Sequence, residues 1–331
     1  MSNNKLEQDT NQHHITEMQK SIETISDPAL KKTLTQVMGR LKNTKIKEDV
    51  KEFNAAVLRA PAKSEQRLLA FMPHQMAKTS LFFPMSDREL KTESRLISRI
   101  EQETGWGKVV IEGIKLAIFE EDIFLALIKI AKDKTKKIGE DYLLETNMNE
   151  IIHILYGRSG YTKKSTERVE KALHHFQLIR FELTTFDWKK KGKERLKTRT
   201  TRSIGNIVAS YKYEGKTKDL KIYFNSHFFA YFLESMLTNI NFTLRRKLKK
   251  DGSKALMRFL STHTRPGRMH ILTVLNGINF NIGQPMNQLR FKLKKFIQEL
   301  KKNEVLGPKT KIYSDDTVYF DILPLKKALP D

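Results

Sequence analysis

Side chains that can hydrogen-bond to nucleic-acid bases gather near the C-terminus of the chain, between residues 286 and 302. Four apolar residues spaced three and four apart would form one inward stripe of a helix there: Leu289, Leu293, Phe296 and Leu300. The opposite and flanking faces of that helix carry Asn287, Gln288, Arg290, Phe291, Lys294 and Lys295. Arginine pairs with guanine, and asparagine or glutamine with adenine, in the major groove of DNA. The spacing therefore predicts a helix that contacts base edges.

Phe291 is an unexpected residue on that outward face, because a solvated helix has little reason to expose a phenylalanine. Two interpretations are open. The ring can meet thymine methyl groups in a DNA groove, or it can pack against the neighbouring short helix or a partner subunit.

A second basic helix is predicted over residues 161–177. Val169, Leu173 and Phe176 form its inward stripe. Its outward candidates for DNA contact are Lys163, Lys164, Arg168 and Lys171, with Arg168 at the edge of the face. Lysine lacks the planar fork of arginine, so these side chains are expected to contact mostly phosphates, which position a protein on DNA without reading its sequence.

The segment 189–202 is the most basic in the chain and connects two predicted strands. Its candidates for DNA contact are Lys189, Lys190, Lys191, Lys193, Arg195, Lys197, Arg199 and Arg202. A long basic wing suits phosphates or a narrow minor groove. A loop that contacts nothing is the alternative.

The net charge also indicates a polyanionic partner. The 331 residues include 61 Lys and Arg against 38 Asp and Glu, a formal net charge of +23. Much of the excess lies in three segments, 189–202, 245–250 and 290–302, rather than being spread evenly. Any one basic run can be a solvated face, but three that coincide with predicted helices and hairpins favour nucleic acid.

Several functional classes lack support in the sequence. The absence of cysteine excludes disulfides, thiolate zinc sites and cysteine nucleophiles. No stretch approaches the ~18 apolar residues of a membrane span, so a cytoplasmic protein without a membrane partner is expected. The segment 105–108, GWGK, ends like a phosphate-binding loop, but position 102 is Gln where that loop needs Gly. No enzyme activity or cofactor is therefore predicted.

Two further clusters could suggest a metal but are better explained otherwise. His174 and His175 are adjacent, so a helix would point them about 100° apart, without a third ligand at metal spacing. Glu120, Glu121 and Asp122 fall in the first turn of a predicted helix, where the helix dipole favours negative charge. No metal site is predicted.

The order of the predicted elements occurs twice from residue 120 onward. Each copy has an apolar helix, a short strand, a short helix, a turn, a basic helix and a hairpin, which is the layout of a winged-helix domain. The predicted fold class is α+β, with winged-helix domains at 66–225 and 226–331 after a helical extension at 1–65. Strands at 179–188, 203–213 and 220–225 are expected to form one sheet of the first domain.

Three blocks of the sequence resemble the plasmid replication initiator family typified by the RepA and TrfA proteins. They are Met72–Pro84, Gly113–Lys132 and Lys254–Arg268. The resemblance implies tandem winged helices that bind directly repeated origin sites, called iterons, open adjacent A·T-rich DNA and recruit the host initiator and replicative helicase. It also implies homodimers, and base contacts made mostly by the C-terminal domain, which agrees with the face around Arg290. The lysine-rich segment 189–202 departs from the family pattern.

Two other functions stay open. A dimeric winged-helix transcriptional repressor, including one that represses its own gene, would bind inverted rather than direct repeats. A chromatin or RNA-binding protein would bind without sequence preference.

Overall fold

The computed structural model describes residues 69–323, apart from residues 80, 87–88, 92–94, 105–106, 140, 158–159, 186–199, 236 and 264–266. All of these belong to the second of two compact units of the chain, Leu58–Asp331. The predicted helical extension 1–65 and the basic residues 189–199 lie outside the described part. Within the described part, no helix is both long and apolar enough to span a membrane.

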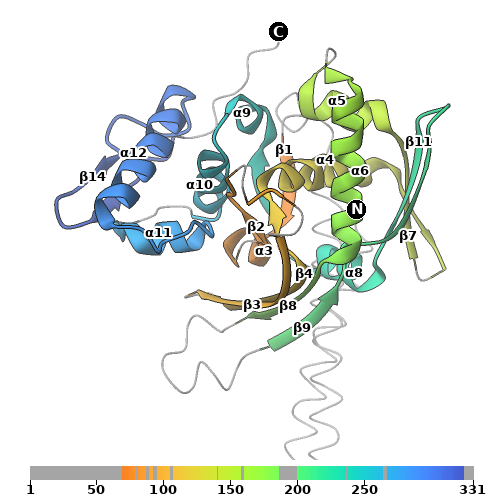
Figure 1. Cartoon of the computed structure of the whole chain (residues 1–331), viewed down its shortest axis with the longest axis horizontal. Helices are drawn as coiled ribbons and strands as arrows, with labels where there is room; N and C mark the ends of the chain where they lie inside the picture. Colours follow the sequence, from red (N-terminus) through yellow and green to blue (C-terminus); the bar gives the residue numbers. More distant parts are fainter. Residues whose placement is uncertain are drawn as a thin grey trace, which may run out of the picture. The chain divides into compact units, whose positions relative to one another are not determined.

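Helix α4 (Ile118–Lys134) forms the centre of the first half and is buried on nearly all sides. Residues 123–128 are each at most 1% exposed. A helix that is apolar all round must be covered all round, and the Phe124 ring indeed lies 5.8 Å from Phe82, 6.4 Å from Phe176 and 6.0 Å from Phe228, measured between centroids. In Figure 1, α4 lies between α10 on one side and α6 on the other.

The first winged-helix unit follows α4 directly. Its four-stranded antiparallel sheet has the order β10-β11-β7-β6. In chain order the elements are β6 (Thr135–Ile138), β7 (Asp141–Asn147), α5 (Met148–Tyr156), α6 (Lys163–Leu178), β10 (Val208–Glu214) and β11 (Asp219–Phe224). The second strand of the hairpin pairs with the strand that precedes α5, as in a winged helix, so β10 and β11 form the wing.

The predicted three-stranded sheet of this domain is wrong. The predicted strand 203–213 is divided: residues 208–213 in β10 do pair with 220–224, whereas residues 200–205 pair with 181–185 in another sheet. This separate antiparallel sheet has the order β3-β4-β8-β9. Its strands are β3 (Leu96–Thr104), β4 (Gly107–Ile114), β8 (Arg180–Thr185) and β9 (Thr200–Gly205). Gly205, with φ of 74°, ends β9, and the chain then enters the wing sheet at Val208. Alternation located the extended segments but merged β9 and β10 into one predicted strand, since it carries no information about strand partners.

The second winged-helix unit repeats the order in a smaller form. Its elements are α10 (Asp251–Ser261), β13 (Met269–His270), α11 (Ile271–Gly277), α12 (Met286–Lys302), β14 (Lys311–Ile312) and β15 (Thr317–Tyr319). The sheet order is β13-β15-β14, so β14 and β15 form the wing. Gly252 lets α10 pack closely on α12, because a Cβ there would lie 2.1 Å from the Phe296 ring.

Shorter elements connect the two halves. Strand β1 (Leu69–Pro73) pairs antiparallel with β12 (Leu237–Asn241), although more than 160 residues separate them in the sequence. The others are α3 (His74–Thr79), β2 (Phe82–Phe83), β5 (Leu116–Ala117), α8 (Ser226–Glu234) and α9 (Phe242–Lys247). Strands β2 and β5 pair in parallel. The β1–β12 pair joins segments from both sides of the predicted domain boundary at 225.

A buried ion network joins the start of α4 to α9 and α10. Glu121 forms ion pairs with Arg258 of α10 and with Arg245 of α9, the latter at 3.1 Å, and all three side chains are at most 1% exposed. Asp122 accepts from Arg245 Nε at 2.7 Å and from Lys254 Nζ at 2.6 Å. Burial alone would lower the pKa of Arg245, but Glu121 and Asp122 outweigh it and raise that pKa. The network keeps Arg245 charged. It also holds α9 and α10, the latter being the first helix of the second winged-helix unit, against α4.

A second buried cluster uses the carboxylate beside Glu121. Glu120 accepts two hydrogen bonds from Arg95 Nη2, at 2.6 and 2.7 Å, and contacts the Nδ1 atom of His175 in α6. It also accepts from the Ala117 amide in a capping box at the start of α4. Glu120 therefore holds α6 against α4, which sets the position of the first basic helix.

Candidate nucleic-acid interface

The predicted inward stripe of α12 is confirmed. Leu289, Leu293 and Leu300 are at most 1% exposed and Phe296 is 8% exposed. Burial of these four side chains against α10 and α11 fixes which face of the helix points outward.

Most of the predicted contact residues of α12 lie on that outward face. Five are exposed: Asn287, Gln288, Phe291, Lys294 and Lys295. Phe291 is 57% exposed, and the Lys295 ammonium lies 4.1 Å from its ring centroid. The ring thus has a cation on one side and does not pack into the core, so the α11-packing interpretation of Phe291 finds no support.

Arg290 is placed differently from the other five residues, because its guanidinium is engaged with the turn of the wing. Nη1 lies 2.5 Å from Asp316 Oδ1, and Nη2 donates to the Tyr313 carbonyl at 2.5 Å. A longer bond of 3.3 Å reaches the Ser314 carbonyl. Base reading by Arg290 stays a prediction, and in the described geometry this arginine positions the wing.

The same turn is held from its other side. The Arg268 guanidinium stacks on the Tyr313 ring at 3.6 Å from the centroid and lies 3.9 Å from Asp315. The residue at the tip, Asp316, has φ of 56°, a left-handed conformation that Asp tolerates better than most residues. Arg290 therefore ties the short wing to α12, and Arg268 ties the same wing to the segment before β13.

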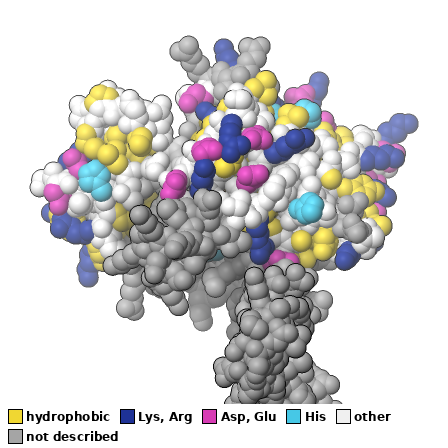
Figure 2. Space-filling view, turned by 90° about the horizontal axis from the view of Figure 1, so that it is seen from below, with side chains coloured by type: hydrophobic (Ala, Val, Ile, Leu, Met, Phe, Trp, Pro, Cys, Tyr) yellow, Lys and Arg dark blue, Asp and Glu magenta, His cyan; other side chains and the backbone are white. Residues whose placement is uncertain are grey.

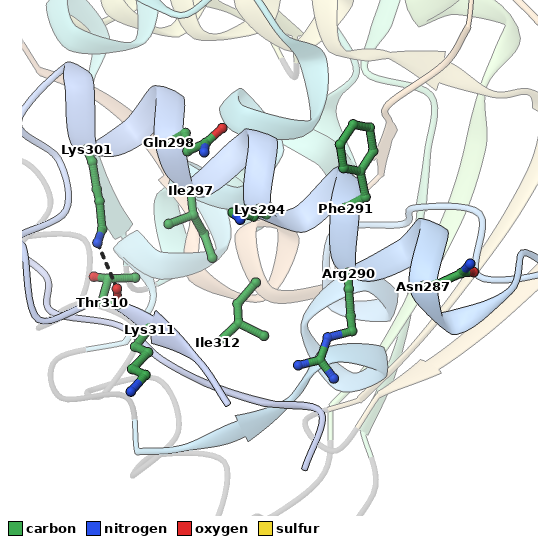
Figure 3. Close-up of a pocket in the computed structure, with 10 residues that line it drawn as sticks. All are labelled: Asn287, Arg290, Phe291, Lys294, Ile297, Gln298, Lys301, Thr310, Lys311 and Ile312. Carbon is green, nitrogen blue, oxygen red and sulfur yellow. Dashed lines mark hydrogen bonds between the residues drawn. The ribbon is translucent and has the colours of Figure 1, made fainter. Parts of the chain in front are cut away.

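A groove of about 640 Å³ runs between the outward face of α12 and the strand β14. Its lining combines apolar side chains with amides and cations: Asn287, Arg290, Phe291, Lys294, Ile297, Gln298, Lys301, Thr310, Lys311 and Ile312. Figure 3 shows Ile297 and Ile312 facing each other across it and Arg290 directed toward the wing. Lys301 donates to the Thr310 carbonyl at 2.8 Å, which ties the end of α12 to the wing. No carboxylate lines the groove, so its occupant should be anionic.

Helix α6 presents the corresponding face of the first unit. The predicted inward residues Val169, Leu173 and Phe176 are fully buried. The predicted outward residues are all exposed: Lys163, Lys164, Arg168 and Lys171. A capping box between Thr162 and Ser165 starts the helix, so its first turn is well defined.

Two of these α6 cations already have neighbours. Lys163 lies 3.9 Å from Glu167, a loose and solvated pair, and the Arg168 guanidinium lies 4.6 Å from the Phe119 ring centroid. Lys164 and Lys171 are therefore the clearest phosphate-contact candidates on the helix.

The wing of the first unit was missed by the sequence analysis. The β10–β11 hairpin carries exposed Lys212, Lys216 and Lys221, and Lys218 Nζ lies 4.9 Å from the Tyr161 ring centroid at the start of α6. The signal was present as two alternating runs around the turn EGKTKD, residues 214–219. The sequence predicts the wing at residues 189–202 instead, because the basic charge is denser there.

The predicted basic wing 189–202 can be followed only at its end. Lys189, Lys190, Lys191, Lys193, Arg195, Lys197 and Arg199 lie outside the described residues. Arg202 lies in β9, and its Nη1 is 3.1 Å from Glu234 Oε2 of α8. Strands β8 and β9, which precede and follow residues 186–199, pair with each other in the sheet β3-β4-β8-β9, whereas the winged-helix sheet contains β10 and β11.

The clusters considered for metal have other roles. His175 is buried against Glu120, and His174 is exposed on α6. Among the described residues, no group of three or more His, Cys, Asp or Glu could hold a metal ion. The acidic residues at the start of α4 pair with Arg95, Arg245 and Arg258, in addition to lying where the helix dipole favours negative charge.

Figure 2 shows lysine and arginine side chains at both ends and in the centre of the face it presents, with acidic side chains among the central ones.

Comparison with solved structures shows what fold this chain shares. Domains 2 and 3 of RctB match with a TM-score of 0.50 and 10% identity, over 76% of this chain and 98% of that one. A second structure of the RctB domains 2-3 matches with a TM-score of 0.41 and 11% identity, over 75% and 96%. The Pi initiator protein in complex with iteron DNA matches with a TM-score of 0.46 and 9% identity, over 77% and 98%.

The described fold is a mixed α+β fold similar to that of domains 2 and 3 of RctB over about three quarters of the chain. At such low identity the likeness concerns the fold alone. No protein-family model matches the sequence, and no curated protein matches it either.

Proposed function

We propose that this protein is a replication initiator that binds directly repeated duplex DNA sites through two winged-helix units. The observation that carries the proposal is the outward face of α12, where exposed amides, lysines and Phe291 border a groove that has four cations and no carboxylate in its lining. Such a face suits the major groove, where amides read bases and cations neutralise phosphates.

The first unit supports binding by both heads. Helix α6 and the β10–β11 wing add exposed lysines on elements that correspond to α12 and the β14–β15 wing. Lysines that contact phosphates position the protein on DNA but do not read its sequence. In this proposal α12 therefore supplies most of the sequence selectivity, and α6 contributes mostly affinity.

The initiator role, as distinct from DNA binding, rests on the three sequence blocks that resemble the RepA and TrfA family. Two of them contribute the buried framework: most of α4 lies in Gly113–Lys132, and α10 begins just before Lys254–Arg268. The proposal includes opening of A·T-rich DNA and recruitment of the host initiator and helicase. It includes no enzyme activity and no cofactor.

A dimeric repressor is the second candidate, because one winged-helix framework serves both functions. Repeat orientation separates the two. A single chain with two heads in fixed order is suited to direct repeats, whereas a symmetric dimer is suited to inverted ones.

The test is a selection from random duplex DNA with the full chain at one fixed salt concentration. The expected result is a motif that spans both heads and is bound as a direct repeat, followed by strand opening of an adjacent A·T-rich segment, detected with a reagent specific for unpaired thymine. Enrichment of inverted repeats without opening would favour the repressor. Equal recovery of all sequences would refute sequence-specific binding.

A further inference from the structure

Phe291 is the one strongly exposed apolar side chain among the described residues of α12. Every other Leu, Ile and Phe of the helix is at most 8% exposed, whereas Phe291 is 57% exposed. The ring stands one turn after Asn287 and one turn before Lys294 and Lys295. An amide, an aromatic ring and cations therefore follow one another along the face assigned to DNA.

The surroundings of the ring limit what can cover it. The groove that Phe291 lines has no carboxylate, and Lys295 Nζ lies 4.1 Å from the ring centroid. An occupant must then be anionic at its edges and apolar where it meets the ring. Duplex DNA has both properties at one place in the major groove, because phosphates border the methyl group at C5 of thymine.

We propose that Phe291 is a specificity-determining residue that contacts the C5 methyl group of a pyrimidine in the bound DNA. This inference rests on the proposed function and deepens it. The same contact would accept the methyl group of thymine or of 5-methylcytosine, since both carry it at the same position of the ring. Uracil and unmodified cytosine lack the group.

The test uses the DNA site recovered by selection and replaces each thymine in turn by deoxyuridine, which pairs identically but lacks the methyl group. At one position in each site the full chain should bind the uracil form about four-fold more weakly, the effect of one buried methyl group. In Phe291→Ala this ratio should fall to one, with weaker binding of the thymine form. Leu178→Ala removes another exposed apolar side chain, at the end of α6, and should keep the four-fold ratio.

A second comparison at that position distinguishes the two sources of the methyl group. If the affinities for 5-methylcytosine and cytosine differ by a similar ratio, Phe291 contacts the methyl group on either base. If only thymine and uracil differ in affinity, the contact is specific for thymine. The thermal midpoint of Phe291→Ala, expected to equal that of the wild type, separates lost contact from lost folding.

Two results would overturn the inference while leaving the proposed function intact. One is sequence-specific binding in which no thymine can be distinguished from uracil. The other is an unchanged ratio in Phe291→Ala, which would show that a different residue contacts the methyl group. If the wild type shows no sequence-specific binding at all, the proposed function fails and this inference fails with it.

Discussion

The guanidinium of Arg290 and the carboxylate of Asp316 form an ion pair that connects the outward face of α12 to the turn of its wing. Their Nη1 and Oδ1 atoms lie 2.5 Å apart, and Arg290 also donates to the Tyr313 carbonyl. Asp316 is thus an acidic residue beside a surface assigned to a polyanion. An orienting role explains this position: Asp316 holds the wing in place through its ion pair with Arg290.

Asp316→Gly should therefore weaken DNA binding, although removal of a negative charge near DNA would by itself strengthen it. Glycine accommodates the φ of 56° at this position, so the change removes the carboxylate without backbone strain. In a double-mutant cycle with Arg290→Ala, the measured affinities should show a coupling of at least about 0.5 kcal/mol.

Asp316→Asn is the matched control for that cycle, because it keeps a hydrogen-bond acceptor and tolerates the left-handed backbone; it should retain most of the affinity. Additive effects, or tighter binding by Asp316→Gly, would contradict the wing-orienting role. If Arg290→Ala relaxes selectivity at a single base pair, Arg290 also reads a base, as the sequence predicts.

The helices of both units were predictable from the sequence because their apolar periodicity is strong. Leu289 and Leu293 identify the buried face of α12, and Val169 and Leu173 that of α6, before any coordinates are known. The exposed residues then follow by geometry alone. This is why the sequence placed Asn287 and Lys171 on the correct faces.

Strand partners and long-range ion pairs were not predictable in the same way. An alternating strand presents the same pattern whichever strand it pairs with, so β9 and β10 could not be assigned to different sheets. Arg290 presents the same sequence signal whether it reads guanine or holds Asp316. Glu121 and Arg258 are 137 residues apart, and no local pattern links them.

Lys164 and Lys171 should contribute to DNA binding through phosphates. Replacing either by Ala should weaken binding to cognate and scrambled DNA by the same factor and reduce the slope of log affinity against log salt by about one unit. The measurement is a salt titration of affinity on both DNAs.

Lys136→Ala is the control for those variants, because Lys136 lies on β6, the sheet edge opposite the β10–β11 wing, and pairs with Glu145 at 3.1 Å. It should leave the slope unchanged. A loss confined to cognate DNA in Lys171→Ala would mean that α6 reads bases instead.

Glu121→Gln should strongly destabilise the protein, because it leaves the buried Arg258 and Arg245 without a carboxylate that both contact. Removing one partner of a buried ion pair costs about 3 to 5 kcal/mol. Denaturant unfolding monitored by circular dichroism should show a much lower midpoint. Glu112→Gln, which removes an exposed partner of Arg99, should leave that midpoint unchanged.

The paired variant Glu121→Met with Arg258→Met provides a further check on the network. Replacing both charges by apolar side chains removes the isolated buried charge, so this protein should be more stable than Glu121→Gln. Equal stability of the two variants would show that Glu121 does not stabilise the folded protein through its ion pair with Arg258.

His74 should make the folded protein less stable at mildly acidic pH. Burial, with Lys78 and His263 nearby, lowers the pKa of His74 from 6.5 to about 4, and its Nδ1 atom lies 2.7 Å from Thr238 Oγ1 of β12. As the pH falls below about 6.5, the unfolded chain takes up a proton that the folded protein resists. Stability is then full above that pH and is lost progressively toward pH 4.

The unfolding midpoint in urea should therefore fall between pH 7 and pH 5, and His74→Asn should reduce that fall because asparagine can keep a hydrogen bond to Thr238 without titrating. The pKa of His263 is also lowered by burial, so part of the pH dependence should persist in the variant. His174→Asn, at an exposed position of α6, should behave as the wild type does. An identical fall in wild type and His74→Asn would show that the pairing of β1 with β12 does not depend on a neutral His74.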